Sequence, residues 1–290
     1  MGVDQSVKTV SADSINSFHL NEKKRIKVKP FNKASLIIQL TIISLVLVTI
    51  YTFISFDYSD INLFEGIIST FQNVKIMFLE PHFKHFSFVT ALYQVMITLG
   101  LAFLTTLFGA LIALFLGFFA ARNLSSKPVS AAIKGFVAVI RSVPTVLWVL
   151  IFAVAAGLGS VAAVIGMTFH TVGYLIKAYS ESFEELDEGV IEALKASGAN
   201  WWQIIFQAVI PSSMTYIISW TFLRFEVNFA VAVAMGAAAG AGGIGFDMFM
   251  ASGFYFDLRE VGVITYFVLA FAIALELIAT KVKTNLKTSA

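Results

Sequence analysis

Several ionisable residues lie inside long apolar stretches of the chain, where a charge is costly and usually has either a partner or a function. Arg224 and Asn228 share one helix face because they are four residues apart. His170 and Tyr174 form a second polar stripe at the same spacing, and Lys177 continues it. Basic side chains at such positions can attract an anion through a low-dielectric region. The ionisable residues in these stretches are Arg141, His170, Lys177, Arg224, Glu226 and Glu276.

Structural roles are the alternative for these residues. Arg141 lies near one end of its apolar stretch, from which a long side chain can reach the level of lipid headgroups. Glu226 points away from Arg224 on a helix and could pair with a basic residue of another helix. A lone histidine is more often a hydrogen-bonded packing residue than a ligand. The candidates for a binding pathway are Arg141, His170, Tyr174, Arg224, Glu226 and Asn228.

A run of small residues follows the Arg224 stretch and reads Gly236-Ala-Ala-Ala-Gly-Ala-Gly-Gly-Ile-Gly245. Small residues let helices approach closely, and consecutive glycines let the backbone leave a helix where it lines a cavity. The run is not a phosphate-binding P-loop, because no Gly-Lys-Ser/Thr follows it. We expect a tight packing turn at the outer end of the pathway, and donation of backbone N–H groups to an anion is the alternative. The gate or packing positions are Gly240, Gly242, Gly243 and Gly245.

The sequence carries no pattern of an enzyme. It contains no cysteine and no nucleophile elbow. The histidines at 19, 82, 85 and 170 are not grouped to bind zinc, and His82 with His85 would supply only two ligands to a weak surface metal. We therefore expect no catalytic residue, no metal site and no ATP site in this chain.

Composition indicates how these residues are positioned. The chain of 290 residues is 58% hydrophobic and 13% charged, with a mean hydropathy of +0.84, whereas soluble domains carry about 25% charged residues. A bilayer-spanning helix needs about 20 apolar residues. The sequence therefore predicts an all-α integral membrane protein with about six transmembrane helices. The six apolar stretches are 35–55, 88–120, 134–157, 160–180, 211–239 and 261–281.

The distribution of basic residues predicts the topology. Lysine and arginine are concentrated before the first stretch, in the link 122–134 and after the last stretch. They are sparse in the links 56–87, 158–159 and 240–260. Because basic residues favour the cytoplasmic side, we expect both termini to be cytoplasmic. The expected organisation is a cytoplasmic basic tail 1–34, a first transmembrane helix 35–55, an extracytoplasmic link 56–87 with an interfacial helix, a membrane core 88–283 and a short cytoplasmic tail 284–290.

A compact polar connector at 181–211 joins two of the apolar stretches. Asp187 can cap a first helix, and Gly198 lies where that helix would stop. Asn200 and Gln203 have the spacing of a capping box at the start of a second helix. Pro211 suits the first turn of a new helix, where a missing N–H costs nothing. The connector therefore predicts a helix, a tight turn and a helix, followed by re-entry into the membrane at the proline.

This connector resembles the EAA loop of binding-protein-dependent ABC importer permeases, through Glu192-Ala193, Gly198 and Ile210-Pro211. The sequence departs from that pattern at Leu194 and Ala208. The resemblance implies a coupling helix that docks on a cytoplasmic ATPase subunit and transmits its closure. The residues that it implicates in coupling are Asp187, Glu192, Ala193, Gly198, Ala199, Ile210 and Pro211.

Three further stretches are similar to the phosphonate-importer branch of these permeases. They are Arg141-Ser142-Val143-Pro144-Thr145, Lys177-Ala178-Tyr179-Ser180-Glu181, and Arg224-Phe225-Glu226-Val227-Asn228 leading to the glycine run. The resemblance covers residues 88–283 and implies a type I ABC importer permease of a bacterial cytoplasmic membrane. Phosphonates, phosphite or phosphate would be its substrates. Another small solute such as an amino acid is the alternative, and an ATP-independent transporter is a more distant one.

The resemblance also implies the partners. The permease would work as a homodimer in lipid, with an extracytoplasmic binding protein and a pair of ATP-hydrolysing subunits. ATP and magnesium would be bound by those ATPase subunits, so this chain would be a transport subunit with no cofactor of its own. No nucleic-acid partner is expected.

Overall fold

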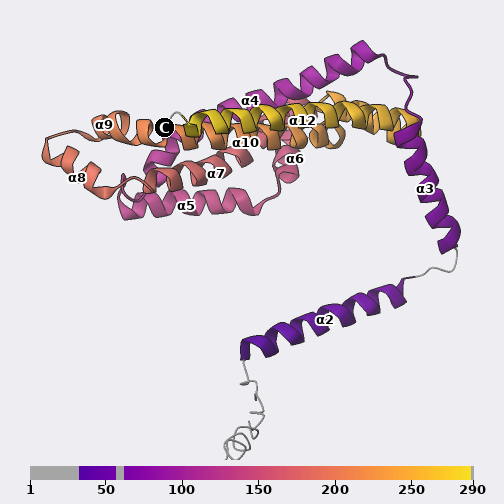
Figure 1. Ribbon diagram of the computed structural model, residues 1–290, viewed down its shortest axis with the longest axis horizontal. Coiled ribbons are helices and arrows are strands. Elements are labelled where there is room, and N and C mark those ends of the chain that lie inside the picture. The colour runs from indigo at the N-terminus through magenta and orange to yellow at the C-terminus, as the bar shows by residue number, and fades with distance from the viewer. Residues whose placement is uncertain (1–32, 57–61, 289–290) are drawn as a thin grey trace, which may run out of the picture. The chain divides into compact units, whose positions relative to one another are not determined.

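A computed structural model describes residues 33–56 and 62–288, with side chains up to residue 284 (Figure 1). All regular secondary structure in these ranges is helical. The chain divides into two units, residues 1–63 and 64–290. The expected basic tail 1–34 lies almost entirely outside the described residues. Within the first unit, helix α2 (Lys33–Ser55) covers the predicted apolar stretch 35–55 and is exposed along its whole length.

The second unit is a bundle of helices built mainly from long apolar segments, so the predicted all-α architecture is confirmed. In chain order the helices are α3 (Leu63–Leu79), α4 (Phe88–Ala120), α5 (Lys127–Ser142), α6 (Thr145–Ala156), α7 (Ser160–Glu184), α8 (Glu188–Ala196), α9 (Trp201–Ile204), α10 (Ile210–Ala239), α11 (Ile244–Gly253) and α12 (Leu258–Thr288). A π-helical turn, Ile205–Val209, connects α9 to α10.

Helix α7 forms the centre of the bundle and packs against α4, α5, α6 and α10. Small residues allow these close contacts. A Cβ atom on Gly166 would lie 2.5 Å from the backbone Cα of Val149 on α6, and one on Gly173 would lie 2.9 Å from the Ile140 side chain on α5. Because backbone cannot yield to such an atom, glycine at 166 fixes how closely α6 approaches α7.

The third apolar stretch, 134–157, was predicted to form one continuous span, and this prediction is wrong. The stretch is divided into α5 and α6, which are bent by 89° at a short break before Thr145. Pro144 explains the break, because proline has no N–H to donate and disfavours helical geometry in the residue before it. Five helices of the described chain are long and apolar enough to cross a membrane, or six if the bent pair counts as one span.

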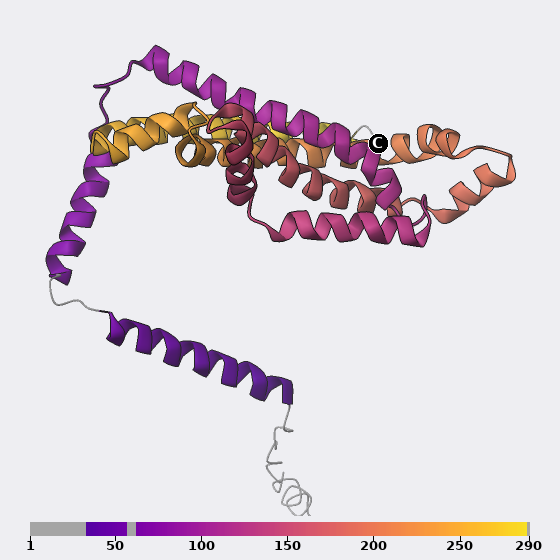
Figure 2. The ribbon, with the colours of Figure 1, turned by 180° about the vertical axis from the view of Figure 1, so that it is seen from behind.

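The bundle has two distinct ends. At one end the link after α4 meets the start of α9, where the Trp201 indole donates a hydrogen bond to the Leu124 carbonyl at 2.8 Å. Figures 1 and 2 show α8 and α9 projecting beyond the bundle at this end, and α12 also finishes here. At the other end the link before α4 meets the start of α12, with His82 Nε2 3.2 Å from Asp257 Oδ2. The link 122–134 and the connector 181–211 therefore lie at one end, and the links 56–87 and 240–260 lie at the other. The basic-residue pattern predicts the same grouping of these four segments.

Candidate functional site

The polar connector forms the predicted pair of capped helices. Asp187 accepts a hydrogen bond from the Gly189 N–H at 2.8 Å and caps α8. At the start of α9 the Asn200 side chain accepts from the Gln203 N–H at 2.9 Å, and the Gln203 side chain accepts from the Asn200 N–H at 2.7 Å. Both caps are therefore confirmed, and local sequence alone defines where each helix begins.

Gly198 makes the turn between α8 and α9. Its φ is +86°, a backbone conformation that residues with a side chain rarely adopt. The Gly198 N–H donates to the Lys195 carbonyl and the Ala199 N–H to the Leu194 carbonyl, both at 3.0 Å. This is the Schellman arrangement that ends a helix with a left-handed residue. No atom lies within 4 Å of where a Cβ would be, so the requirement for glycine here is conformational.

The prediction that Pro211 lies in the first turn of a new helix is confirmed, but no loop separates that helix from the one before it. The chain from Trp201 to Ala239 is one helical segment, and Pro211 lies in the first turn of α10, just after the π-helical turn. That wider turn accommodates a residue that has no N–H to donate. The second helix of the connector is therefore continuous with a membrane-length helix, so a force on α9 reaches α10 directly.

One side of the connector is held by the bundle and the other is uncovered. Ile191 and Ile204 are buried, and Trp201 stacks on Phe119 of α4 with ring centroids 5.1 Å apart. All seven positions that the sequence implicates in coupling are exposed or half-buried: Asp187, Glu192, Ala193, Gly198, Ala199, Ile210 and Pro211. Three large apolar side chains also face outward without cover, namely Val190, Trp202 and Phe206. These residues give the connector an apolar free face.

Replacing Asn200 with alanine should destabilise the start of α9 by about 1 kcal/mol, because the side-chain acceptor of the capping box is lost. The expected readout is faster backbone hydrogen exchange at residues 201–204 in purified protein. An alanine replacement of a second asparagine, Asn123, would not serve as the control, because the Asn123 side chain itself donates a hydrogen bond to the Phe183 carbonyl. Lys195→Ala, at an exposed position of α8, is the matched control and should leave exchange in α9 unchanged. Equal exchange in wild type and Asn200→Ala would contradict the capping assignment.

A buried polar chain crosses the centre of the bundle. Arg224 Nε on α10 donates to Thr171 Oγ1 on α7 at 3.3 Å, and Thr171 Oγ1 donates to Asn228 Oδ1 at 3.2 Å. The Asn228 amide then donates to Thr106 Oγ1 on α4 at 2.9 Å. Arg224 is 4% exposed and Asn228 is completely buried. The predicted pairing of Arg224 and Asn228 on one helix face is thus part of a network through three helices.

Thr106 and Thr171 are the members of this network that the sequence did not indicate. A threonine in an apolar helix usually donates to the carbonyl four residues earlier and gives no signal of a further role. Thr106 makes that bond, to the Ala102 carbonyl at 2.7 Å, and also accepts from Asn228. Only the packing of α4, α7 and α10 shows that the two hydroxyls complete the chain.

The guanidinium of Arg224 also faces the aromatic ring of Tyr174, with 5.1 Å between the central carbon and the ring centroid. Arg141 approaches the same helix from α5, since a Cβ on Gly173 would lie 3.3 Å from its Cγ. His170 lies one turn from Tyr174 on α7. The structure therefore groups five of the six pathway candidates along one part of α7, namely Arg141, His170, Tyr174, Arg224 and, through Thr171, Asn228.

Several polar atoms in this region have no partner. Arg224 Nη2, His170 Nδ1 and Thr168 Oγ1 are buried and make no hydrogen bond within the described chain. No carboxylate in residues 33–56 and 62–284 forms an ion pair with Arg224, and the expected pairing of Glu226 with a basic residue is likewise not found there. A buried guanidinium without a counter-ion is costly. The arrangement therefore offers a fixed positive charge and free donors to an anion.

The glycine run is a packing turn between α10 and α11. Gly240 ends α10 in the left-handed conformation, with φ +61°. The Ile244 N–H donates to Thr98 Oγ1 on α4 at 3.0 Å, and a Cβ on Gly243 would collide with that hydroxyl. A Cβ on Gly245 would collide with the Val233 carbonyl oxygen. Close packing explains the run without an anion, and Gly242, with φ +80°, completes the turn.

Replacing Gly245 with alanine should destabilise the bundle by about 1–3 kcal/mol, because the methyl group overlaps backbone that cannot move aside. Thermal unfolding of the purified protein in detergent measures the effect. Gly253→Ala in the same helix is the matched control, since its Cβ would be 3.7 Å from the Phe249 ring, an ordinary contact. An unfolding midpoint unchanged by Gly245→Ala would contradict the close approach of α10 and α11.

Comparison with known proteins agrees with this architecture. The chain resembles a chain of the structure entitled "Inward facing conformations of the MetNI methionine ABC transporter: CY5 native crystal form", with 19% identity and a TM-score of 0.61. The match covers 69% of this chain and 99% of that chain. The fold is therefore that of type I ABC importer permeases.

Two curated relatives are more similar in sequence. The phosphate-import permease protein PhnE of Mycolicibacterium smegmatis is 32% identical over 61% of this chain and 33% of its own length. The phosphite transport system permease protein PtxC of Stutzerimonas stutzeri is 33% identical over 60% of this chain and 62% of its own. The match thus spans a third to three fifths of these relatives.

The family model described as "Binding-protein-dependent transport system inner membrane component" matches residues 113–286. This range includes α5 to α11, most of α12, the two-helix connector and the buried polar chain except Thr106. The protein is thus a multi-pass membrane protein, and the chain belongs to the family of binding-protein-dependent transport system inner membrane components.

Proposed function

We propose that this chain is the permease subunit of an ATP-driven importer for phosphonates or related phosphorus oxyanions. In this proposal it passes solute across a bacterial cytoplasmic membrane, and two partner ATPase subunits bind ATP and magnesium. An extracytoplasmic binding protein delivers the solute. Membership of the family supports this assignment, and so does the capped two-helix connector with its uncovered apolar face. The chain itself would then carry out no chemical reaction.

The proposed orientation places α8 and α9 in the cytoplasm. The basic link 122–134 lies at the same end of the bundle as this connector, and so does the end of α12. The sparsely basic links before α4 and between α10 and α12 meet at the other end. Because lysine and arginine favour the cytoplasmic side, the connector would face the ATPase and the C-terminus would be cytoplasmic. By the same reasoning the basic N-terminal tail would be cytoplasmic.

The single observation that supports the substrate class is the buried positive charge of Arg224, unpaired within residues 33–56 and 62–284. This residue is a buried cation without a counter-ion in the described chain, and one of its terminal nitrogens has no partner. Guanidinium groups match the geometry of phosphate-like oxyanions. The names of the two curated relatives refer to phosphate and phosphite, two oxyanions of phosphorus. An oxyanion passing α7 would therefore meet Arg224 together with Thr168, His170 and Arg141.

In this proposal, the closure of the ATPase subunits is transmitted to the pathway through the continuous helix formed by α9, the π-helical turn and α10. Closure of two ATPase subunits would draw together the connectors of a permease homodimer. Since α9 continues through the π-helical turn into α10, movement of the connector shifts the helix that carries Arg224 and Asn228. Those residues bind α7 and α4 through the polar chain, so the shift reaches the proposed pathway. A pathway that opens alternately to the two sides would result.

Uptake into vesicles tests the substrate class. The permease would be reconstituted with its ATPase and binding protein, and uptake of a labelled alkylphosphonate would be measured against unlabelled phosphonate, phosphite, phosphate and an amino acid. We expect competition by phosphorus oxyanions alone. Competition by the amino acid alone would overturn the substrate assignment and favour an importer of that solute class.

A further inference from the structure

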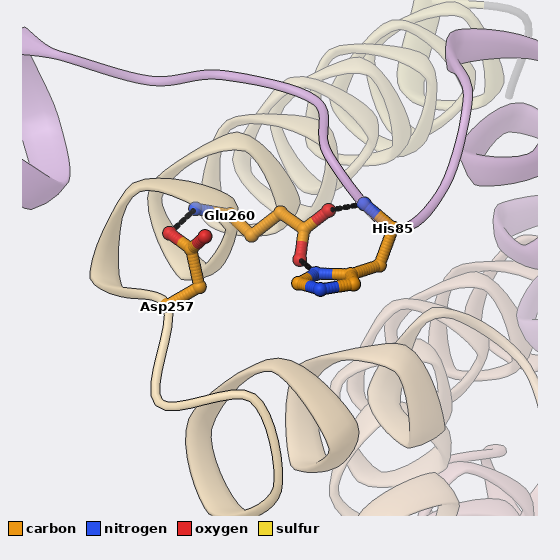
Figure 3. Close-up of side chains that lie close together, drawn as sticks. All are labelled: His85, Asp257 and Glu260. Atoms are coloured by element: carbon orange, nitrogen blue, oxygen red, sulfur yellow. Dashed lines mark hydrogen bonds and ion pairs between the residues drawn. The ribbon is translucent and has the colours of Figure 1, made fainter.

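A cluster of histidine and carboxylate side chains lies at the end of the bundle opposite α8 and α9. His85, Asp257 and Glu260 each offer one potential metal-ligand atom, and these atoms lie within 4.8 Å of one another. Figure 3 shows His85 on the link before α4, with Asp257 and Glu260 at the start of α12. His85 and Glu260 are 175 residues apart in sequence. The sequence indicated only His82 and His85 as potential ligands here, and the structure places two carboxylates beside them.

Backbone groups hold both carboxylates in place. Glu260 Oε1 accepts hydrogen bonds from the N–H groups of Lys84, at 2.9 Å, and His85. Asp257 Oδ1 accepts from the N–H groups of Arg259, at 3.1 Å, and Glu260, at 3.2 Å. Each carboxylate thus has one oxygen bound by backbone and a second oxygen available. Metal-binding carboxylates are commonly oriented by such outer hydrogen bonds.

The available oxygens face imidazole nitrogens. Glu260 Oε2 lies 2.6 Å from His85 Nδ1, and Asp257 Oδ2 lies 3.2 Å from His82 Nε2. The His85 ring is itself held by stacking on Tyr255, with centroids 3.9 Å apart and planes inclined by 14°. One imidazole and two carboxylates from distant segments are therefore preorganised around one point, and a second imidazole, that of His82, lies beside Asp257.

The cluster brings two carboxylates close together. Glu260 is completely buried, and Asp257 is a second carboxylate within reach. The neighbouring cation Arg259 pairs with Glu80 at 2.6 Å. Asp247 lies in the first turn of α11. Its pKa is raised to about 6, first by burial and second by the negative charge of Glu260. Buried carboxylates are normally paired or coordinate a metal.

We propose that His85, Asp257 and Glu260 bind a divalent transition-metal ion of the zinc class, with His82 placed to supply a fourth ligand. Imidazole nitrogen and carboxylate oxygen are ligands that zinc accepts, whereas magnesium and calcium take oxygen ligands only. The ion occupies the place of the proton between His85 and Glu260. It fastens the link before α4 to the start of α12. Further along α12, Tyr266 donates to the Phe78 carbonyl of α3 at 2.5 Å.

Zinc binding to the full-length permease, purified in detergent and treated with a chelator, tests this site. We expect one zinc ion per chain by competition with a chromophoric chelator, and no competition by magnesium or calcium. A hundredfold excess of zinc over its dissociation constant should raise the unfolding midpoint by about 5 °C. Binding should weaken at pH 5, because protons compete for the imidazole and carboxylate lone pairs.

Variants identify the ligands. His85→Ala and Glu260→Gln should each weaken zinc binding at least about tenfold. The side chain of His85 is partly exposed, so His85→Ala remains informative even if Glu260→Gln does not fold. Glu80→Gln is the matched control, since it removes a neighbouring carboxylate that pairs with Arg259, and it should bind zinc like the wild type. The proposal would be overturned if the wild type bound no zinc, or if His85→Ala bound zinc as tightly as the wild type. The contact between His85 and Glu260 would then be a hydrogen bond only.

Discussion

Gly198→Val should uncouple ATP hydrolysis from import. Valine would have to adopt the φ of +86° that ends α8, which costs a β-branched residue about 1–3 kcal/mol. The turn would rearrange and the angle between α8 and α9 would change. In reconstituted vesicles we expect uptake at least tenfold lower while the ATPase subunits continue to hydrolyse ATP.

Two controls separate this effect from general damage to the connector. Gly198→Asn should retain most uptake, because asparagine enters the left-handed conformation more readily than other residues with a side chain. Ala196→Val places the same β-branched side chain at an exposed helical position two residues earlier and should also retain uptake. Wild-type uptake by Gly198→Val would show that the turn does not transmit the motion of the ATPase.

Arg224→Gln should reduce uptake of a phosphorus oxyanion by about 10-fold to 100-fold, since a hydrogen bond to a charged group contributes about 1.5–3 kcal/mol. Glutamine preserves a donor that can reach Thr171 but removes the positive charge from the buried polar chain. Arg224→Lys should retain part of the activity, because it keeps a charge without the planar fork of donors. Initial uptake rates at saturating ATP measure these effects.

Lys177→Gln is the charge-matched control for Arg224. Lys177 continues the polar stripe on α7, but its side chain is half exposed and lies 3.6 Å from Glu181 in an ion pair within the same helix. We expect wild-type uptake from this variant. If Arg224→Gln and Lys177→Gln both transport at the wild-type rate, selectivity resides outside the membrane helices, and Arg224 has only a packing role.

Local signals in the sequence predict much of this structure. Asp187, Gly198, Asn200 and Gln203 define the connector because caps and left-handed turns depend on neighbouring residues. The apolar stretches likewise predict the long helices, since a run of about 20 apolar residues is informative by itself. Polar residues four apart indicated that Arg224 and Asn228 act together.

Features that depend on contacts between distant segments were not predicted. Glu260 is an ordinary acidic residue at a helix start in the sequence, and it is buried only because the link that carries His85 folds over it. The bend before Thr145 required weighing Pro144 against an apolar run that otherwise favours one span. The continuity of α9 with α10 depends on a π-helical turn, for which the sequence around Phe206 gives no distinct pattern.

The most direct test of the central claim is whether transport through this chain requires ATP hydrolysis by a partner. Vesicles would contain the permease and binding protein with an active ATPase, with a hydrolysis-deficient ATPase, or with none, and uptake of labelled phosphonate and phosphite would be followed in each. The account predicts accumulation against a gradient only with the active ATPase. Equal uptake without the ATPase would contradict it and identify the protein as an ATP-independent transporter.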